Sequence, residues 1–138
     1  MSAEENKALI RHGMETAEQN LEAWFALFDP ACHFPHLPAY GLPPTLEGYQ
    51  QFLTAALPSF ADGQDTVEEI VAEGEMVMVW AIHSATHSGP WRNIPATNKR
   101  VSFQEIVFYR LAHGKIVECR VLYDTFGFLQ QVGAIPTS

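Results

Sequence analysis

Asp124 is the residue whose type and position best suit proton transfer. It lies near the end of a run of β-branched and aromatic residues close to the C-terminus, and such runs form strands. If Phe103, Leu122 and aromatic residues of a helix surround the carboxylate, the loss of water contacts raises its pKa towards neutrality. A carboxyl group with such a pKa can remove a proton next to a carbonyl group and later return it. The alternative is that Asp124 only caps a short helical segment that follows it.

A β-hairpin is expected to position Asp124. Residues 101–111 and 115–125 are rich in β-branched and aromatic side chains, and the Gly-containing turn between them is a hairpin signal. If His113 and Gly114 form a two-residue turn, Phe103 faces Asp124. Residues with carboxylate, guanidinium, aromatic and aliphatic groups then share one face, which is typical of a pocket wall, although a solvated outer face has the same pattern. The predicted face consists of Phe103, Glu105, Val107, Tyr109, Glu118, Arg120, Leu122 and Asp124.

Glu105 and Arg120 are the charged residues that this pairing brings near Asp124. Arg120 would lie about 7 Å along the strand from Asp124, where its positive charge would lower the pKa of Asp124. Glu105 would act as a second acid or form an ion pair with Arg120. The predicted substrate-binding wall of the hairpin comprises Arg120, Glu105, Phe103, Tyr109 and Leu122.

Histidine and aromatic residues outside the hairpin supply further candidates. His36 lies in the proline-rich segment 33–44, which would cover the mouth of a cavity, and we expect it to assist Asp124 in catalysis. For each histidine, a purely structural role is the alternative. The other candidate ligand contacts are Tyr40, Trp80 and His87, and Trp80 would otherwise belong to a dimer contact. Trp91 and Arg92 lie in a long loop and form either a lid or an ordinary solvent-facing loop.

No residue pattern indicates a metal or cofactor. His83 and His87 share one face of a strand but would be about 13 Å apart, too far for one metal ion. Cys32 and Cys119 give neither a disulfide framework nor zinc-ligand spacing. Cys119 also lies on the predicted face opposite Asp124, which makes it a poor candidate nucleophile. We therefore expect chemistry without a cofactor.

Composition excludes several classes of protein. The chain has 138 residues, which suits a single domain spanning 1–138. Its formal net charge of −8 and the lack of a Lys/Arg cluster argue against a nucleic-acid partner. It has no apolar run long enough to cross a membrane and no signal-peptide pattern at the N-terminus. The sequence thus predicts a cytoplasmic protein without a membrane or nucleic-acid partner.

Hydrophobic periodicity predicts helices first and strands afterwards. A capping box at Ser2 and Glu5 begins one long amphipathic helix that ends at Asp29, and a second helix runs from the cap residue Thr45 to Pro58. Strands are expected over 66–73, 76–87 and the two hairpin segments. This order predicts an α+β fold in which N-terminal helices pack in the concave face of a curved antiparallel sheet, forming a cone-shaped α+β barrel.

The other predicted face of the hairpin is apolar. It contains Ile106, Phe108, Val117, Val121 and Tyr123, which would form a wide exposed patch on a monomer. We therefore expect a homodimer that buries this outer face.

Short motifs spread over the second half of the chain resemble the SnoaL-like polyketide cyclases. They are Thr86–Gly89 (THSG), Pro95–Val101 (PATNKRV), Phe108–Arg110 (FYR), Gly114–Glu118 (GKIVE), Tyr123–Asp124 (YD) and Leu129–Gly133 (LQQVG). The resemblance implies a nuclear-transport-factor-2-like cone fold, a homodimer, and an acid/base role for Asp124. It also implies a cyclase- or isomerase-like reaction on a hydrophobic carbonyl or polyketide-like molecule. Two alternatives stay open, because this fold hosts many functions: a non-catalytic binder of small molecules and a dimeric interaction domain.

Overall fold

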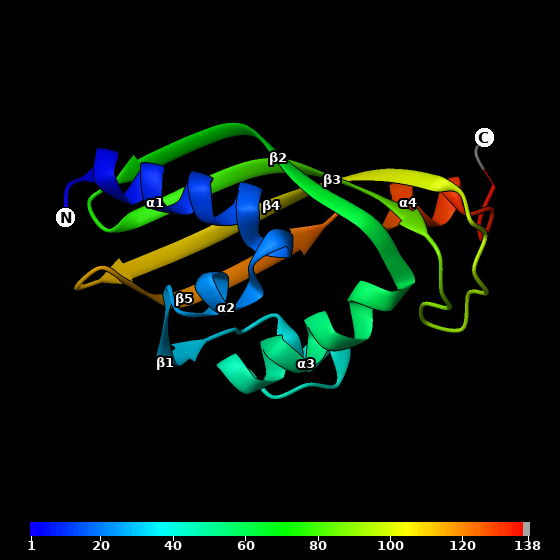
Figure 1. Ribbon diagram of the computed structural model, residues 1–138, viewed down its shortest axis with the longest axis horizontal. Helices are drawn as coiled ribbons and strands as arrows, with labels where there is room; N and C mark the ends of the chain where they lie inside the picture. The colour runs from blue at the N-terminus through cyan, green and yellow to red at the C-terminus, as the bar shows by residue number, and fades with distance from the viewer. Residues whose placement is uncertain (137–138) are drawn as a thin grey trace.

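The computed structural model describes residues 1–136 and has the predicted α+β fold. The described residues contain one mixed sheet with the strand order β1-β5-β4-β3-β2. The strands are β1 (Phe28–His33), β2 (Phe60–Glu73), β3 (Met76–His87), β4 (Arg100–Ala112) and β5 (Lys115–Tyr123). The helices are α1 (Ala3–Thr16), α2 (Leu21–Phe25), α3 (Leu46–Ala56) and α4 (Thr125–Gln131), with short 3-10 turns η1 (Ala17–Gln19), η2 (Leu37–Tyr40) and η3 (Leu57–Ser59). Figure 1 shows α1, α2 and α3 over one face of the curved sheet.

The N-terminal helical region is broken, where one continuous helix was predicted. The capping box is present, since the Ser2 hydroxyl accepts a hydrogen bond from the Glu5 amide and the Glu5 side chain accepts one from Ser2. However, α1 ends at Thr16, and Asn20 leaves the helical region with φ −154°. The Asn20 side chain accepts a hydrogen bond from the Ala23 amide and so begins α2. This local competition of an Asn side chain with the helix cannot be read from apolar spacing.

Strand β1 was not predicted. Residues 28–33 pair with β5 in the parallel direction, although Pro30 lies within them. A proline is tolerated here because β1 is an edge strand, where one side of the backbone has no partner. The predicted cap of the second helix is confirmed, since the Thr45 side chain accepts a hydrogen bond from the Gly48 amide.

A β-bulge in β5 makes the predicted register of the hairpin wrong beyond its first pairs. Next to the turn, Leu111 pairs with Ile116 as predicted. One residue farther from the turn, Arg110 of β4 pairs with Glu118 and not with Val117. Val117 is therefore an additional residue on β5. Because side chains alternate between the two faces of a strand, one extra residue reverses the direction of all those that follow.

The core lies between the helices and the inner face of the sheet. It includes the fully buried side chains Ile10, Phe34, Leu37, Leu111 and Ile116. Burial of a large apolar side chain contributes about 1.5–3 kcal/mol to stability, so this layer fixes the helices against the sheet. In the described part of the chain, no helix combines the length and hydropathy needed to span a membrane.

Candidate active site

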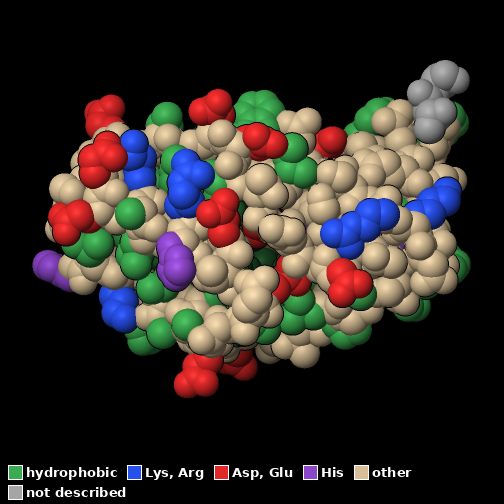
Figure 2. Space-filling model, turned by 45° about the horizontal axis from the view of Figure 1, so that its top comes forward, with side chains coloured by type: hydrophobic (Ala, Val, Ile, Leu, Met, Phe, Trp, Pro, Cys, Tyr) green, Lys and Arg blue, Asp and Glu red, His purple; other side chains and the backbone are tan. Residues whose placement is uncertain are grey.

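A cavity of about 390 Å³ opens between the helices and the inner sheet face. In the space-filling view of Figure 2, this part of the surface is hollowed near its middle, and acidic side chains border the hollow. Many of the residues that line it are aromatic: Trp24, Tyr40, Tyr49, Phe52, Phe60, Trp91, Phe103, Tyr109, Tyr123 and Phe128. Such a wall suits a flat, apolar molecule.

Acidic and histidine side chains meet on the sheet side of this cavity. Asp65 on β2 pairs directly with His83 on β3, and their side chains are joined by a 2.8 Å contact between Oδ1 and Nδ1. Glu105 on β4 pairs with Ala81, the neighbouring inward-facing residue of β3. Because Ala81 has only a methyl group, the Glu105 side chain can cross above β3 and reach the carboxyl group of Asp65, with which it shares a hydrogen bond.

Burial makes Glu105 a weaker acid than an ordinary glutamic acid. Only 8% of the residue is exposed. Desolvation, followed by the charge of Asp65 and its hydrogen bond, raises the pKa of Glu105 well above its ordinary value, and the charge of Glu18 acts in the same direction. In the protonated form Glu105 is the donor of the hydrogen bond that it shares with Asp65.

His83 is held in a defined orientation by Asp65. Burial alone would lower the pKa of His83, but the hydrogen bond and charge of Asp65, together with the charge of Glu18, raise it above its ordinary value. With Nδ1–H donated to Asp65, the second ring nitrogen, Nε2, is the one left for proton exchange. The His83 side chain lines the cavity.

Glu18 completes this group, which we call the acid cluster (Glu18, Asp65, His83 and Glu105). Desolvation raises the pKa of Glu18, although the charge of His83 opposes the shift. Its position depends on two irregularities of the chain. The break after α1 places Glu18 in η1, and Gly63 in an irregular part of β2 leaves room, because a Cβ at position 63 would collide with the Glu18 carboxylate.

Asp124 lies at the edge of the same cavity, but its surroundings differ. It is exposed, and its Oδ1 accepts a 2.9 Å hydrogen bond from the Gly127 amide at the start of α4. The capping role considered from the sequence is therefore present. Because Asp124 also borders the cavity, its role in acid/base chemistry stays a proposal.

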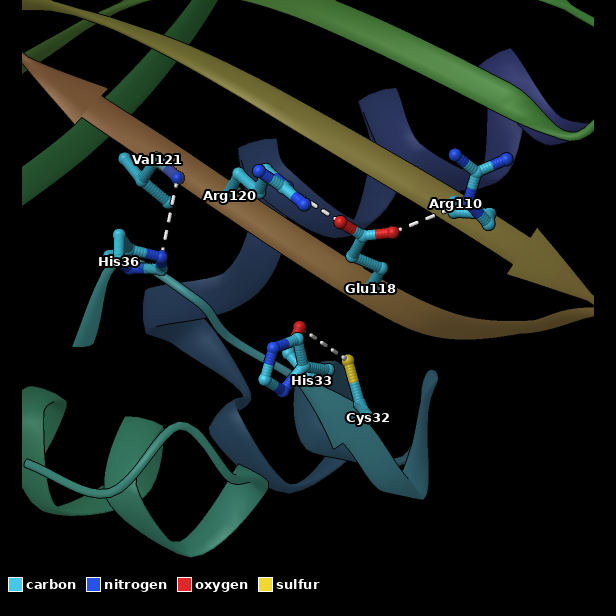
Figure 3. Close-up of polar contacts among 7 residues, drawn as sticks. All are labelled: Cys32, His33, His36, Arg110, Glu118, Arg120 and Val121. Atoms are coloured by element: carbon cyan, nitrogen blue, oxygen red, sulfur yellow. Dashed lines mark hydrogen bonds and ion pairs between the residues drawn. The ribbon is translucent and has the colours of Figure 1, made fainter. Parts of the chain in front are cut away.

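The bulge in β5 overturns part of the predicted wall. Arg120 and Leu122 lie on the outer face, where Leu122 is 70% exposed. Figure 3 shows Arg120 and Arg110 both directed at Glu118, with which they form ion pairs of 2.6 and 3.3 Å. Neither Arg120 nor Leu122 lines the cavity among the described residues. Their predicted place in the substrate-binding wall was wrong because the alternation was continued across the bulge.

The inner face of β5 instead carries residues that were predicted to point outward. Cys119, Val121 and Tyr123 line the cavity, while Phe103, Glu105 and Tyr109 of β4 lie on its wall in the direction predicted. Desolvation raises the pKa of the Cys119 thiol well above its ordinary value. The thiol is therefore a poor nucleophile even though it faces the cavity.

His36, His87 and Trp80 were candidate site residues, and none of them lines the cavity in the described structure. His36 Nδ1 accepts a 3.4 Å hydrogen bond from the Val121 amide, as Figure 3 shows, and so connects the proline-rich segment to β5. His87 is fully buried and receives a hydrogen bond from the Thr97 amide. Trp80 is 47% exposed on the outer face. Tyr40, in contrast, lies on the cavity wall.

Sequence reasoning missed Asp65 and the proximity of Glu18. The alternation of β3 did contain a signal, because His83 falls on the same face as small apolar residues such as Ala81 and Ala85. A buried strand face that carries a titratable residue needs a partner for it on a neighbouring strand. The partner on β2 could not be identified, since β2 changes register near Gly63 and again near Glu68.

Within residues 1–136, no group of His, Cys, Asp and Glu side chains is arranged to hold a metal ion.

Comparison with known proteins identifies the family. A sequence model of SnoaL-like polyketide cyclases matches residues 8–132, whereas a search of curated proteins finds no match. Among solved structures, TsrD from Streptomyces laurentii has a TM-score of 0.85 and 20% identity, covering 98% of this chain and 100% of that chain.

AclR from Streptomyces galilaeus, which has been proposed to be a hydroxylase, has a TM-score of 0.84 and 23% identity, covering 99% of this chain and 86% of that chain. IdmH from Streptomyces antibioticus, which has been proposed to be a polyketide cyclase, has a TM-score of 0.79 and 24% identity, covering 96% of this chain and 99% of that chain. At these identities the structural likeness shows the fold, and the family follows from the sequence match over most of the chain. The protein belongs to the SnoaL-like polyketide cyclase family.

Proposed function

We propose that this protein is a cofactor-free acid/base enzyme of the cyclase or isomerase type, acting on a hydrophobic, polyketide-like carbonyl compound in the cavity. The observation that carries the proposal is the acid cluster, in which His83, held by Asp65, lies beside the buried Glu105, whose pKa is raised well above its ordinary value. Enolisation requires a base that takes the proton from carbon and an acid that gives a proton to the carbonyl oxygen.

The proposed reaction begins with proton removal by His83. Neutral Nε2 takes a proton from the carbon next to the substrate carbonyl, and the electron pair of the C–H bond forms the C=C bond of an enol. The carbonyl oxygen takes the proton of Glu105 in the same step, which leaves a Glu105 carboxylate and a His83 imidazolium. Asp65 stabilises the imidazolium through its 2.8 Å contact with Nδ1.

The enol then has two possible fates. If the substrate also has a C=C bond conjugated with the enol, His83 can return its proton to the far carbon of this dienol while Glu105 recovers its own from the enol oxygen. The double bond then moves, and the reaction is an isomerisation. If the enol carbon attacks a second carbonyl of the same molecule, a ring closes. The new alkoxide then takes the proton of His83, and Glu105 recovers its proton from the original oxygen.

Asp124 is the alternative acid/base residue, as the family resemblance implies. Its place at the cavity edge supports this role, while its exposure and its bond to the Gly127 amide favour the cap. Phe103, Tyr109 and Tyr40 are the proposed ligand contacts in either case.

The test follows exchange of the protons next to the carbonyl of 2-tetralone, a flat bicyclic ketone, in deuterated buffer by NMR. We expect the wild type to accelerate exchange over buffer and H83Q to lose about 10²- to 10⁴-fold of that acceleration, the usual contribution of a positioned base. H12Q, which changes an exposed histidine of α1, is the matched control and should retain the wild-type rate. Full activity of H83Q would exclude the acid cluster as the source of the catalysis.

A non-catalytic binding protein is the second candidate function, because the same aromatic cavity would serve it. In that case 2-tetralone would shift the NMR signals of cavity residues without any exchange above the buffer rate.

We also propose a homodimer formed through the outer face of the sheet. Met76, Met78, Trp80 and Leu122 are each at least 36% exposed there, although Val121 and Tyr123, once expected on this face, point inward. Light scattering after size exclusion should give a dimer for the wild type at micromolar concentration and a monomer for L122E. A monomeric wild type would contradict the proposal.

A further inference from the structure

Arg92 is the one Lys or Arg side chain among the described residues that line the cavity. It lies in the loop between β3 and β4 and is exposed, so it stands where the cavity opens to solvent. Within residues 1–136, no carboxylate oxygen lies within 4.0 Å of its guanidinium, whereas Arg110 and Arg120 are both paired with Glu118. Its charge is thus available to a ligand.

A rigid turn presents this side chain. Trp91 and Ile94 exchange two backbone hydrogen bonds of 2.9 Å, which close a two-residue hairpin turn. Both central residues have left-handed backbones, with φ of 49° at Arg92 and 67° at Asn93. Asn tolerates this conformation, but for Arg it is strained by about 1 kcal/mol or more. Strain of this kind concentrates at ligand-binding positions.

Aromatic rings hold the guanidinium in place. The Arg92 guanidinium carbon lies 4.5 Å from the centroid of the Tyr40 ring and 5.9 Å from that of Trp91. The attraction between the cation and the face of the Tyr40 ring uses none of the guanidinium N–H groups, so the planar group can still present an N–H edge to a ligand. Such an edge matches the two oxygens of a carboxylate, which can accept a pair of parallel hydrogen bonds.

The acid cluster lies apart from Arg92 along the wall. From Tyr40, the ring contacts run through Phe52, Tyr123 and Phe103 before they reach His83. The cavity therefore has a cationic position at its opening and an acidic group on its sheet side, with aromatic surface between them. Asp124 also borders the cavity, but its carboxylate is engaged with the Gly127 amide.

We propose that the ligand of this cavity carries a carboxylate at one end of a flat apolar body, and that Arg92 recognises this carboxylate at the opening. The remaining body would lie against the aromatic wall, with its reactive end towards the acid cluster. This inference rests on the proposed function, since it adds a substrate class to the same site, but it concerns binding and not proton transfer. With a net charge of −8, the protein would repel an anion elsewhere on its surface, so a local cation is needed.

Binding of 2-naphthoate and 2-naphthamide tests the proposal, because the two probes share one ring system and differ in charge. We expect the wild type to bind the carboxylate about five- to tenfold more tightly than the amide, as measured by calorimetry at low salt. Added sodium chloride should reduce this preference, since the Arg92 side chain is exposed.

Variants separate the role of Arg92 from general charge. R92Q should abolish the preference for the carboxylate, and R92K should retain part of it, because the charge remains without the planar fork. R11Q removes an exposed arginine of α1 and the same unit of charge, so it should behave as the wild type. H83Q should lose proton exchange while it keeps the carboxylate preference, which distinguishes this inference from the proposed function.

Two results would overturn the inference. One is equal affinity of the wild type for the carboxylate and the amide, or the absence of binding of either probe. The other is an unchanged preference in an R92Q variant whose circular dichroism and melting temperature match those of the wild type. If R92Q fails to fold, R92K and R11Q are compared. A smaller carboxylate preference in R92K than in R11Q supports the inference, and equal preferences contradict it.

Discussion

Glu105 and Asp124 are carboxyl groups at the same cavity, yet their surroundings give them different properties. Glu105 belongs to the acid cluster on the inner sheet face, where it is 8% exposed, and its pKa is raised well above the ordinary value. Asp124 is exposed, and its oxygen satisfies the first amides of α4. The comparison teaches that a position near the end of the last strand does not by itself make a carboxyl group a proton donor. Desolvation and neighbouring charges do so.

The largest expected effect distinguishes the two carboxyl groups by activity. In the 2-tetralone exchange assay, E105Q should lose about 10²- to 10⁴-fold of the acceleration, since its amide has no proton to give to the carbonyl oxygen. D124N should stay within about threefold of the wild type, because an Asn keeps the cap of α4. If D124N lost more activity than E105Q, the acid/base role would belong to Asp124, and the contrast drawn between the two carboxyl groups would be wrong.

A smaller effect concerns Gly63 and its contact with Glu18 of the acid cluster. G63A introduces a methyl group that collides with the Glu18 carboxylate, and we expect it to lower the free energy of unfolding by about 1–3 kcal/mol, as overpacking does. In an E18A background the same substitution should have little effect, because the colliding group is gone. A double-mutant cycle in urea measures this coupling, and additive losses would show that Glu18 does not occupy the space above Gly63.

The pH dependence of stability follows from the raised pKa of Glu105. The folded protein binds this proton more tightly than the unfolded chain, in which the pKa has its ordinary value of 4.5. The stability that Glu105 contributes is therefore fully present below that value, and it is lost as the pH rises through the folded-state pKa. The pKa of His83 is also raised, so the stability that His83 contributes is likewise lost as the pH rises above 6.5, its ordinary pKa.

Urea unfolding at a series of pH values measures this effect. Above the ordinary pKa of Glu105, the free energy of unfolding of the wild type should fall relative to that of E105Q. A constant difference between wild type and E105Q across this range would mean that Glu105 ionises normally.

The smallest expected effect belongs to the cap at Asp124. D124A should lower the free energy of unfolding by about 1 kcal/mol, whereas D124N should lower it by only a few tenths, because Asn and Asp are comparable N-cap residues. Equal losses in the two variants would show that the charge of Asp124, and not its hydrogen bond to Gly127, stabilises the fold.

Much of the fold could be predicted because its signals are local. The cap residues Ser2 and Thr45 mark helix starts through hydrogen bonds within a few residues. The alternation of residues 76–87 defines β3 by itself, and on β4 the same alternation places Glu105 among inward-facing residues. Strand β1 was missed, because a proline-containing edge strand has little local signal and depends on its pairing with β5.

The candidate site, too, could be predicted only in part. Sequence by itself determined the α+β order, the family and the grouping of Phe103, Glu105 and Tyr109 on one face of β4, since each depends on residue types and their local spacing. Whether that face pointed into a cavity or to solvent stayed open. Tertiary structure alone decided which partners meet: the bulge at Val117 turned Arg120 outward, and β2 brought Asp65 to His83. The physical reason is that strand register depends on the pairing of distant segments. A single extra residue there reverses a whole face, although the local pattern of the sequence is unchanged.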